Sequence, residues 1–137
     1  MIAANLFTIK YWFNYKFSQA LKNGNECNTR ILRELYKWNG LLMDGSYTNE
    51  SINLKKEFIT KENIVDLFIK YNVPKHINLL SVDIDFNDFY CLKEILKHYK
   101  VDIIICEYNS SHLPNEDKII IYMKIEFFYK TLIVPYT

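Results

Sequence analysis

The sequence has little glycine, proline or cysteine, and each shortage excludes a class of protein. Only three glycines and three prolines occur in 137 residues, which excludes collagen-like repeats and glycine- or proline-rich low-complexity chains. The three cysteines, Cys27, Cys91 and Cys106, are odd in number, and no two of them have metal-ligand spacing. We interpret them as small buried apolar residues in a reducing compartment.

An excess of charge of either sign is also missing. The formal net charge is +1, so the chain lacks the electric field that favours nucleic acid or an anionic membrane as a partner. No apolar run reaches the roughly 18 residues that a membrane span needs. The N-terminus has neither a basic start nor a small-residue cleavage site. We therefore expect a cytoplasmic protein with no nucleic-acid or membrane partner.

The residues that are present indicate one globular α/β domain. Half of them are hydrophobic and 24% are charged, a balance typical of globular proteins. The length suits a single core, so we expect one domain over residues 1–137. Continuous apolar runs predict buried strands, and helical patterns lie between them, which together indicate a Rossmann-like, mostly parallel sheet with crossover helices. The expected strands are 41–44, 78–84 and 101–107, and the expected helices are 29–38, 62–72 and 88–99.

Polar residues and glycine at the ends of these helices indicate caps. Residues 55–59 predict a short edge strand. The N-terminal stretch predicts a helix at the start and a strand over 11–17, and two further strands are expected at 119–122 and 125–134. The expected caps are Asn28 or Thr29, Gly40, Thr60, and Asn87 or Asp88.

Three of the predicted strands end in acidic residues. Asp44 follows the first, Asp83 and Asp85 end the next, and Glu107 with Asn109 ends the last. Because parallel strands bring their carboxyl ends to one edge, these side chains should lie together where open α/β sheets bind ligands. The alternative is that each acid only caps the helix that follows its strand. Asp83-Ile84-Asp85 also matches the Asp-x-Asp element of metal-dependent nucleotide-sugar transferases.

Four stretches of the sequence resemble a known family. They are Leu41-Leu42-Met43-Asp44-Gly45, 58–64, 79–90, and 107–110 with 114–117. They look like an uncharacterised group of bacterial and viral proteins related to FkbM-type methyltransferases. That family implies a Rossmann-like, methyltransferase-type fold, S-adenosylmethionine as the cofactor, and a small-molecule or glycan substrate. The resemblance covers roughly residues 24–120, and residues 1–22 and 118–137 match poorly.

The resemblance also implies roles for individual residues. Gly24, Asn25 and Glu26 stand where the family has its cofactor loop. Asp44 matches the acid that accepts hydrogen bonds from the ribose hydroxyls, and Asp83 matches an acid at the methyl-transfer centre. The residues that would meet the substrate or a metal are Asp85, Asn87, Asp88, Glu107 and Asn109.

The sequence departs from the family where glycine is expected. Phe86 replaces a glycine in the acid-rich turn, and Gly24 is the one glycine left in the cofactor loop. A truncated copy that keeps the fold without activity is therefore the alternative to a methyltransferase. Such a copy would be a fold remnant or an interaction module. The terminal segments, rich in aromatic and β-branched residues, would make it self-associate.

Overall fold

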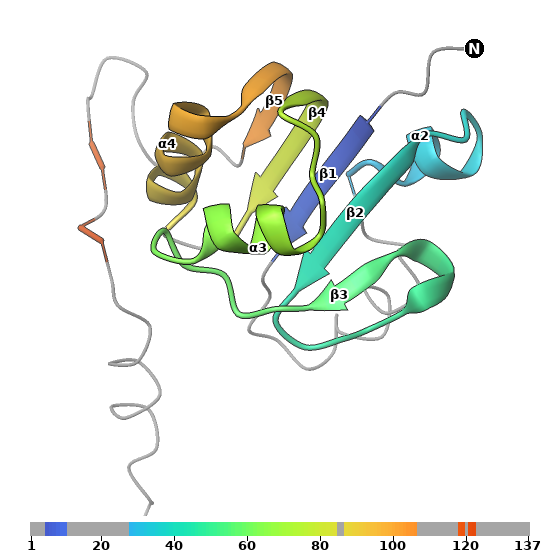
Figure 1. The fold of residues 1–137 in the computed structure, drawn as a ribbon, viewed down its shortest axis with the longest axis horizontal. Coiled ribbons are helices and arrows are strands. Elements are labelled where there is room, and N and C mark those ends of the chain that lie inside the picture. Colours follow the sequence, from blue (N-terminus) through green and yellow to red (C-terminus); the bar gives the residue numbers. More distant parts are fainter. Residues whose placement is uncertain (1–4, 11–27, 85–86, 107–117, 120, 123–137) are drawn as a thin grey trace, which may run out of the picture.

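A computed structural model of the chain describes residues 5–10, 28–84, 87–106, 118–119 and 121–122. These residues form five strands, three α-helices and one 3₁₀ helix (Figure 1). In chain order the elements are β1 (Asn5–Lys10), α2 (Arg30–Glu34), β2 (Asn39–Asp44), η1 (Glu50–Ile52), β3 (Leu54–Lys56), α3 (Ile64–Lys70), β4 (His76–Asp83), α4 (Asp88–His98) and β5 (Lys100–Cys106).

The five strands form one parallel sheet in the order β3-β2-β1-β4-β5. This is the order of the first five strands of the doubly wound sheet, in which strand order reverses between the first and fourth strands. The predicted strands 41–44, 78–84 and 101–107 are confirmed as β2, β4 and β5. The expected α/β class with parallel strands is therefore confirmed, and so is the short edge strand, which is β3.

The middle strand of the sheet is β1, and the sequence analysis assigned it wrongly as a helix. Phe7 pairs in register with Leu41 of β2 on one side and with Leu80 of β4 on the other. Pairing on both edges satisfies the backbone of β1 fully, which outweighs the helix-like spacing of its apolar residues. The strand predicted over 11–17 lies outside the described residues.

Helices α3 and α4 lie side by side over one face of the sheet, as Figure 1 shows. The connections that contain them both step toward β5, and right-handed crossovers that step in one direction share one face. Between them and the sheet lies the main apolar core. Its buried residues are Leu41, Met43, Ile59, Ile64, Leu67, Phe68, Val73, Ile77, Leu80, Val82, Ile84, Cys91, Ile95 and Tyr99.

Helix α3 begins and ends through local backbone bonds. The Thr60 hydroxyl accepts from the Asn63 N–H at 3.3 Å, and the Asn63 side chain accepts from the Thr60 N–H at 2.8 Å. This reciprocal pair confirms Thr60 as a cap, in the manner of a capping box. At the other end, Asn72 has a φ of 54° and the Val73 N–H donates to Phe68 O, which closes the helix one residue before Pro74.

Helix α2 is shorter and more exposed than expected. It ends at Glu34, and it buries no residue. Ile31 and Leu35, which we expected on its inner stripe, are 60% and 65% exposed. The chain turns away because Lys37 adopts a φ of 55° and Trp38 N–H bonds back to Leu32 O. Gly40 is therefore not a cap but the second residue of β2.

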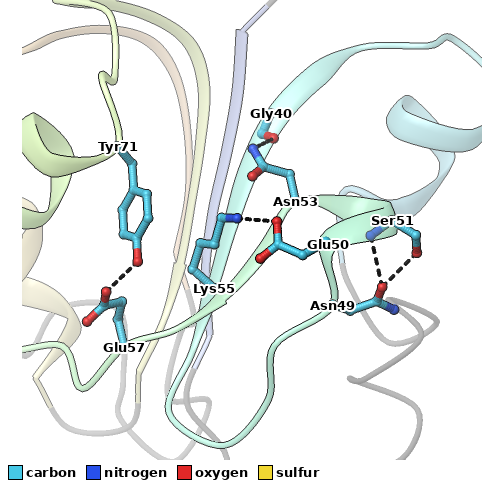
Figure 2. Close-up of polar contacts among 8 residues, drawn as sticks. All are labelled: Gly40, Asn49, Glu50, Ser51, Asn53, Lys55, Glu57 and Tyr71. Atoms are coloured by element: carbon cyan, nitrogen blue, oxygen red, sulfur yellow. Dashed lines mark hydrogen bonds and ion pairs between the residues drawn. The ribbon is translucent and has the colours of Figure 1, made fainter.

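The connection from β2 to β3 contains no α-helix and is held by side chains (Figure 2). Asn49 Oδ1 accepts from the N–H and hydroxyl of Ser51, which starts η1. Asn53 has a φ of 52°, and its amide donates to Gly40 O at 2.8 Å. These bonds return the chain to the sheet edge, where Leu54 pairs with Leu42.

The far side of the sheet ends in β5, whose apolar residues are exposed. Ile103 and Ile104 are 52% and 40% exposed, and Cys106 is exposed as well. Beside β5, the outer face of α4 exposes Phe89 and Leu96. We call these four residues, Phe89, Leu96, Ile103 and Ile104, the β5 flank.

Two sequence predictions fail in this half of the chain. Cys91 is buried as expected, but Cys106 is not, because it ends an edge strand, and Cys27 lies outside the described residues. Ile119, Ile121 and Tyr122 belong to no strand, so the strand predicted over 119–122 is wrong. The strand predicted over 125–134 lies outside the described residues.

We predict that two isoleucines of α3 differ sharply in their contribution to stability. Ile64 is fully buried, whereas Ile69 is 59% exposed. Ile64→Ala should lower the free energy of unfolding by about 2–5 kcal/mol, the usual cost of a buried isoleucine. Ile69→Ala should change it by about 0.5 kcal/mol or less. Urea titration followed by circular dichroism measures both, and equal effects would contradict the packing described for α3.

Candidate functional site

The candidate site is the carboxyl edge of the sheet around the end of β1. Lys10 ends β1 and pairs in register with Asp44 of β2 on one side and Asp83 of β4 on the other. The two acids therefore stand on the same edge, two strand spacings apart, which is about 10 Å. The point where the strand order reverses, between β1 and β4, lies between them, and this is where open α/β sheets bind ligands.

Asp44 is 2% exposed, and its carboxylate is used by the loop that follows β2. Oδ1 accepts from the Ser46 N–H at 2.7 Å and from the Tyr47 N–H at 3.1 Å. The Asp44 carbonyl also accepts from the Glu57 N–H at 2.9 Å, which joins the loops after β2 and β3. Asp44 therefore organises two loops of the carboxyl edge and caps no helix, since the N-cap of the next element, η1, is Asn49.

Asp83, Asn87 and Asp88 lie together between the end of β4 and the start of α4. Asp88 Oδ1 accepts from the Ile84 N–H at 2.9 Å, which closes the turn between the two elements. Asn87 occupies the N-cap position and is buried, and its carbonyl accepts from the N–H groups of Tyr90 and Cys91. The expected cap position is confirmed, although the Asn87 side chain makes no capping bond.

Burial raises the pKa of the Asp88 carboxyl, and the negative charge of Asp83 raises it further. Hydrogen bonds from the backbone N–H groups of Ile84 and of Asp88 itself act in the opposite direction but are weaker. Asp88, which neighbours the acid Asp83, is therefore protonated more easily than an ordinary aspartate. Perturbed acids of this kind are frequent in ligand sites.

The other predicted site residues lie outside the described part of the chain: Gly24, Asn25, Glu26, Asp85, Glu107 and Asn109. Gly24, Asn25 and Glu26 belong to the connection between β1 and α2. Among the described residues, no group of three or more histidine, cysteine or acidic side chains could hold a metal ion. Of the Asp-x-Asp pair, only Asp83 is described.

Two features of this edge were missed by sequence reasoning. Lys10 was overlooked because its strand was assigned as a helix, although the run Leu6-Phe7-Thr8-Ile9 before it has strand-forming residues. The second feature is an aromatic and charged cluster of Lys61, Glu62, Tyr90 and Tyr122. Glu62 and Tyr122 are 60 residues apart in the chain, and nothing in the sequence pattern links them.

Comparison of the chain with protein-family models, with curated proteins and with solved structures finds no match. The resemblance to FkbM-type methyltransferases therefore stays a prediction. In the described residues, no helix has the length and apolar character to cross a membrane.

We predict that Asp88 makes the stability of the protein depend on pH. Its pKa is raised in the folded state, so the folded protein holds this proton more tightly than the unfolded chain. The stabilisation that protonated Asp88 gives the folded state is therefore lost as the pH rises above about 4, the ordinary pKa of aspartate. Asp88→Asn keeps Oδ1 for the Ile84 N–H and removes the ionisation.

The measurement is the urea midpoint of wild type and Asp88→Asn at several values between pH 3.5 and pH 6.5, about the range in which such a group titrates. The advantage of Asp88→Asn over wild type should grow as the pH rises through this range. Asp66→Asn on the exposed side of α3 is the control and should show no such trend. A constant difference between wild type and Asp88→Asn at all pH values would refute the prediction.

Proposed function

We propose that this chain is a domain of the methyltransferase type that binds S-adenosylmethionine at its carboxyl edge. The observation that carries the proposal is the strand order β3-β2-β1-β4-β5, with Asp44 and Asp83 on either side of its reversal point. Doubly wound sheets bind nucleotide-containing ligands at this point. The methyl acceptor would be a small molecule or a glycan.

Asp44 would receive the ribose of the cofactor. A carboxylate that ends the second strand offers acceptor oxygens to a diol, and this agrees with the resemblance to FkbM-type proteins. The carboxylate accepts through Oδ1 from two backbone N–H groups. The bonds to Ser46 and Tyr47 would hold the carboxylate in place for that contact.

Asp83 and Asp88 would lie on the methyl-transfer side of the cofactor, beyond the reversal point. Burial is the main cause of the raised pKa of Asp88, and the charge of Asp83 adds to it. A cation bound beside the two acids would stabilise their charged forms. The sulfonium of S-adenosylmethionine carries such a charge.

The proposal predicts that Asp44→Asn weakens S-adenosylmethionine binding about tenfold or more, the order expected for one lost hydrogen bond to a charged acceptor. Asparagine keeps an oxygen for the Ser46 and Tyr47 N–H groups but replaces Oδ2 with a donor, so the loop should keep its shape. Isothermal titration calorimetry measures the affinity, and a thermal melt checks that folding is unchanged.

Asp66→Asn is the matched control, because it removes the same charge from an exposed position on α3 and leaves the residues that end the strands unchanged. It should bind S-adenosylmethionine as wild type does. Wild type that binds no S-adenosylmethionine would refute the proposal. Equal affinity of wild type and Asp44→Asn would show that the cofactor, if bound, does not use Asp44.

The β5 flank favours a second function, that of an interaction module that pairs with another copy of the chain. In the described residues, β5 pairs only with β4, and Ile103 and Ile104 are exposed on opposite faces of this edge. The run Ile103–Cys106 at the end of β5 carries neither charge nor proline, and strand edges of this kind readily pair with another strand. Two copies related by a twofold axis could join their β5 edges antiparallel, which makes the interface self-complementary.

If the protein pairs with a second copy in this way, it should be a dimer in solution, and one charged substitution on the β5 edge should disrupt that dimer. Wild type should scatter light as a dimer at concentrations of tens of micromolar, about the range for a modest interface. Ile103→Lys should convert it to a monomer, because a lysine on the edge opposes strand pairing. Ile69→Lys, at an equally exposed position on α3, should leave it dimeric. A monomeric wild type would exclude the interface.

A further inference from the structure

Ser81 is a polar residue inside the apolar run Leu79–Val82 of β4. Leu80 and Val82, on either side of it, belong to the core between the sheet and helices α3 and α4. Successive side chains of a strand point to opposite faces of the sheet. Ser81 therefore lies on the face of the sheet that is turned away from α3 and α4.

The hydroxyl of Ser81 is buried without a partner. The residue is 1% exposed, and among the described residues its Oγ finds no hydrogen-bond partner. A buried hydroxyl gives up its bonds to water, and this costs free energy unless other bonds replace them. Alanine would fit the same position without that cost. A buried polar atom in this state indicates a place where a group from outside the chain completes the bonding.

The described side chains next to Ser81 on this face show where such a group would lie. Leu79, two residues earlier in β4, is buried, and Ile105 of β5 pairs with Ser81 in register. Both are apolar and offer no hydrogen bond. Asp83, two residues later, is half-buried and ends the strand at the carboxyl edge. Among these described neighbours Asp83 is the polar one, so a group that reaches Ser81 from the edge also meets Asp83.

Ser81 therefore shares a face with the acids of the candidate site. Asp44 and Asp83 both pair in register with Lys10, which puts them on one face of the sheet, and Ser81 shares that face with Asp83. Two neighbouring strand residues of one face are about 7 Å apart along the strand. Two hydrogen bonds of about 2.9 Å each nearly span that distance. One atom of a ligand can therefore bond to the Asp83 carboxylate and to Ser81 Oγ together.

An ammonium is the group that these two side chains suit. An ionised carboxylate accepts hydrogen bonds and donates none, a hydroxyl oxygen also accepts, and an ammonium has three donors. The charges at this edge favour the same group. Burial raises the pKa of Asp88, and the negative charge of Asp83 raises it further. A positive group bound beside these acids stabilises their ionised forms.

We propose that Ser81 is a ligand-contacting residue of the carboxyl edge, whose hydroxyl accepts a hydrogen bond from an ammonium of the ligand while the Asp83 carboxylate balances its charge. The inference rests on the proposed function, because S-adenosylmethionine carries an ammonium at its amino-acid end. The hydroxyl costs the unliganded fold stability, and the bond to the ligand restores it. Ser81 is then part of what distinguishes ligands with an ammonium from those without one.

The experiment measures the affinity of the full chain for three probes by isothermal titration calorimetry. S-adenosylmethionine and S-adenosylhomocysteine carry the ammonium, whereas 5′-methylthioadenosine keeps the nucleoside and lacks the amino-acid end. Ser81→Ala should weaken binding of the first two probes about three- to tenfold, the order expected for one hydrogen bond. It should leave the affinity for 5′-methylthioadenosine unchanged. Ser81→Thr keeps a hydroxyl and should retain the affinity of wild type.

Urea titration of the same proteins gives a second measurement, in which the effect has the opposite sign. Because Ser81→Ala removes an unpartnered hydroxyl, its urea midpoint should be at or above that of wild type. Ser51→Ala is the matched control, because the Ser51 hydroxyl is exposed and donates to Asn49 Oδ1 at 2.6 Å. Its loss should not raise the midpoint, and it should leave the affinity for all three probes unchanged.

Two results would overturn this inference while the proposed function stands. One is equal affinity of wild type and Ser81→Ala for S-adenosylmethionine, since the hydroxyl would then contact no ligand. The other is an equal loss of affinity for 5′-methylthioadenosine, since the contact would then not be made by the ammonium. Wild type that binds no S-adenosylmethionine would refute the proposed function itself, and the role of Ser81 with it.

Discussion

The structure depends on the pairing of β1 on both of its edges. This strand gives β2 and β4 a common neighbour, and it aligns Lys10, Asp44 and Asp83 in one row. Because the chain reaches β2 and β3 on one side of β1 and β4 and β5 on the other, right-handed crossovers must put α3 and α4 on one face. The core between α3, α4 and the sheet follows from that arrangement.

Where strands end, the backbone N–H groups of the loops at the carboxyl edge need hydrogen-bond acceptors. Asp44 provides an acceptor after β2, and Asp88 provides one after β4. The same carboxylates are the candidates for a ligand. The two roles are compatible because backbone N–H groups hold each carboxylate in a fixed position at the strand end. Structural bonds of this kind would preorganise the carboxylates for a ligand.

Much of the fold could be predicted from the sequence, because strands buried on both faces have continuous apolar runs. This pattern located β2, β4 and β5, and the helical spacing of Leu92, Ile95, Leu96 and Tyr99 located α4. It failed for β1, whose apolar residues have spacings that suit a helix as well as a strand. It also failed for the exposed side of α2, because Lys37 adopts a left-handed conformation that its residue type does not signal.

The candidate site was predictable only in part, for a related reason. Acids that directly follow an apolar run can be assigned to the carboxyl edge, which is why Asp44 and Asp83 were found. The contact between Tyr122 and Glu62 spans 60 residues and depends on where α3 and α4 stand relative to each other. No local pattern encodes that distance, so this contact could be found only in three dimensions.

Helix α4 connects all of these features, because its period turns successive residues by about 100°. Asp88 closes the turn after β4, and Phe89 is exposed on the β5 flank. Tyr90 contacts Tyr122, and Cys91 enters the core. Four consecutive residues thus face the carboxyl edge, the flank, Tyr122 and the core. A displacement of this one turn would therefore be felt at each of these places.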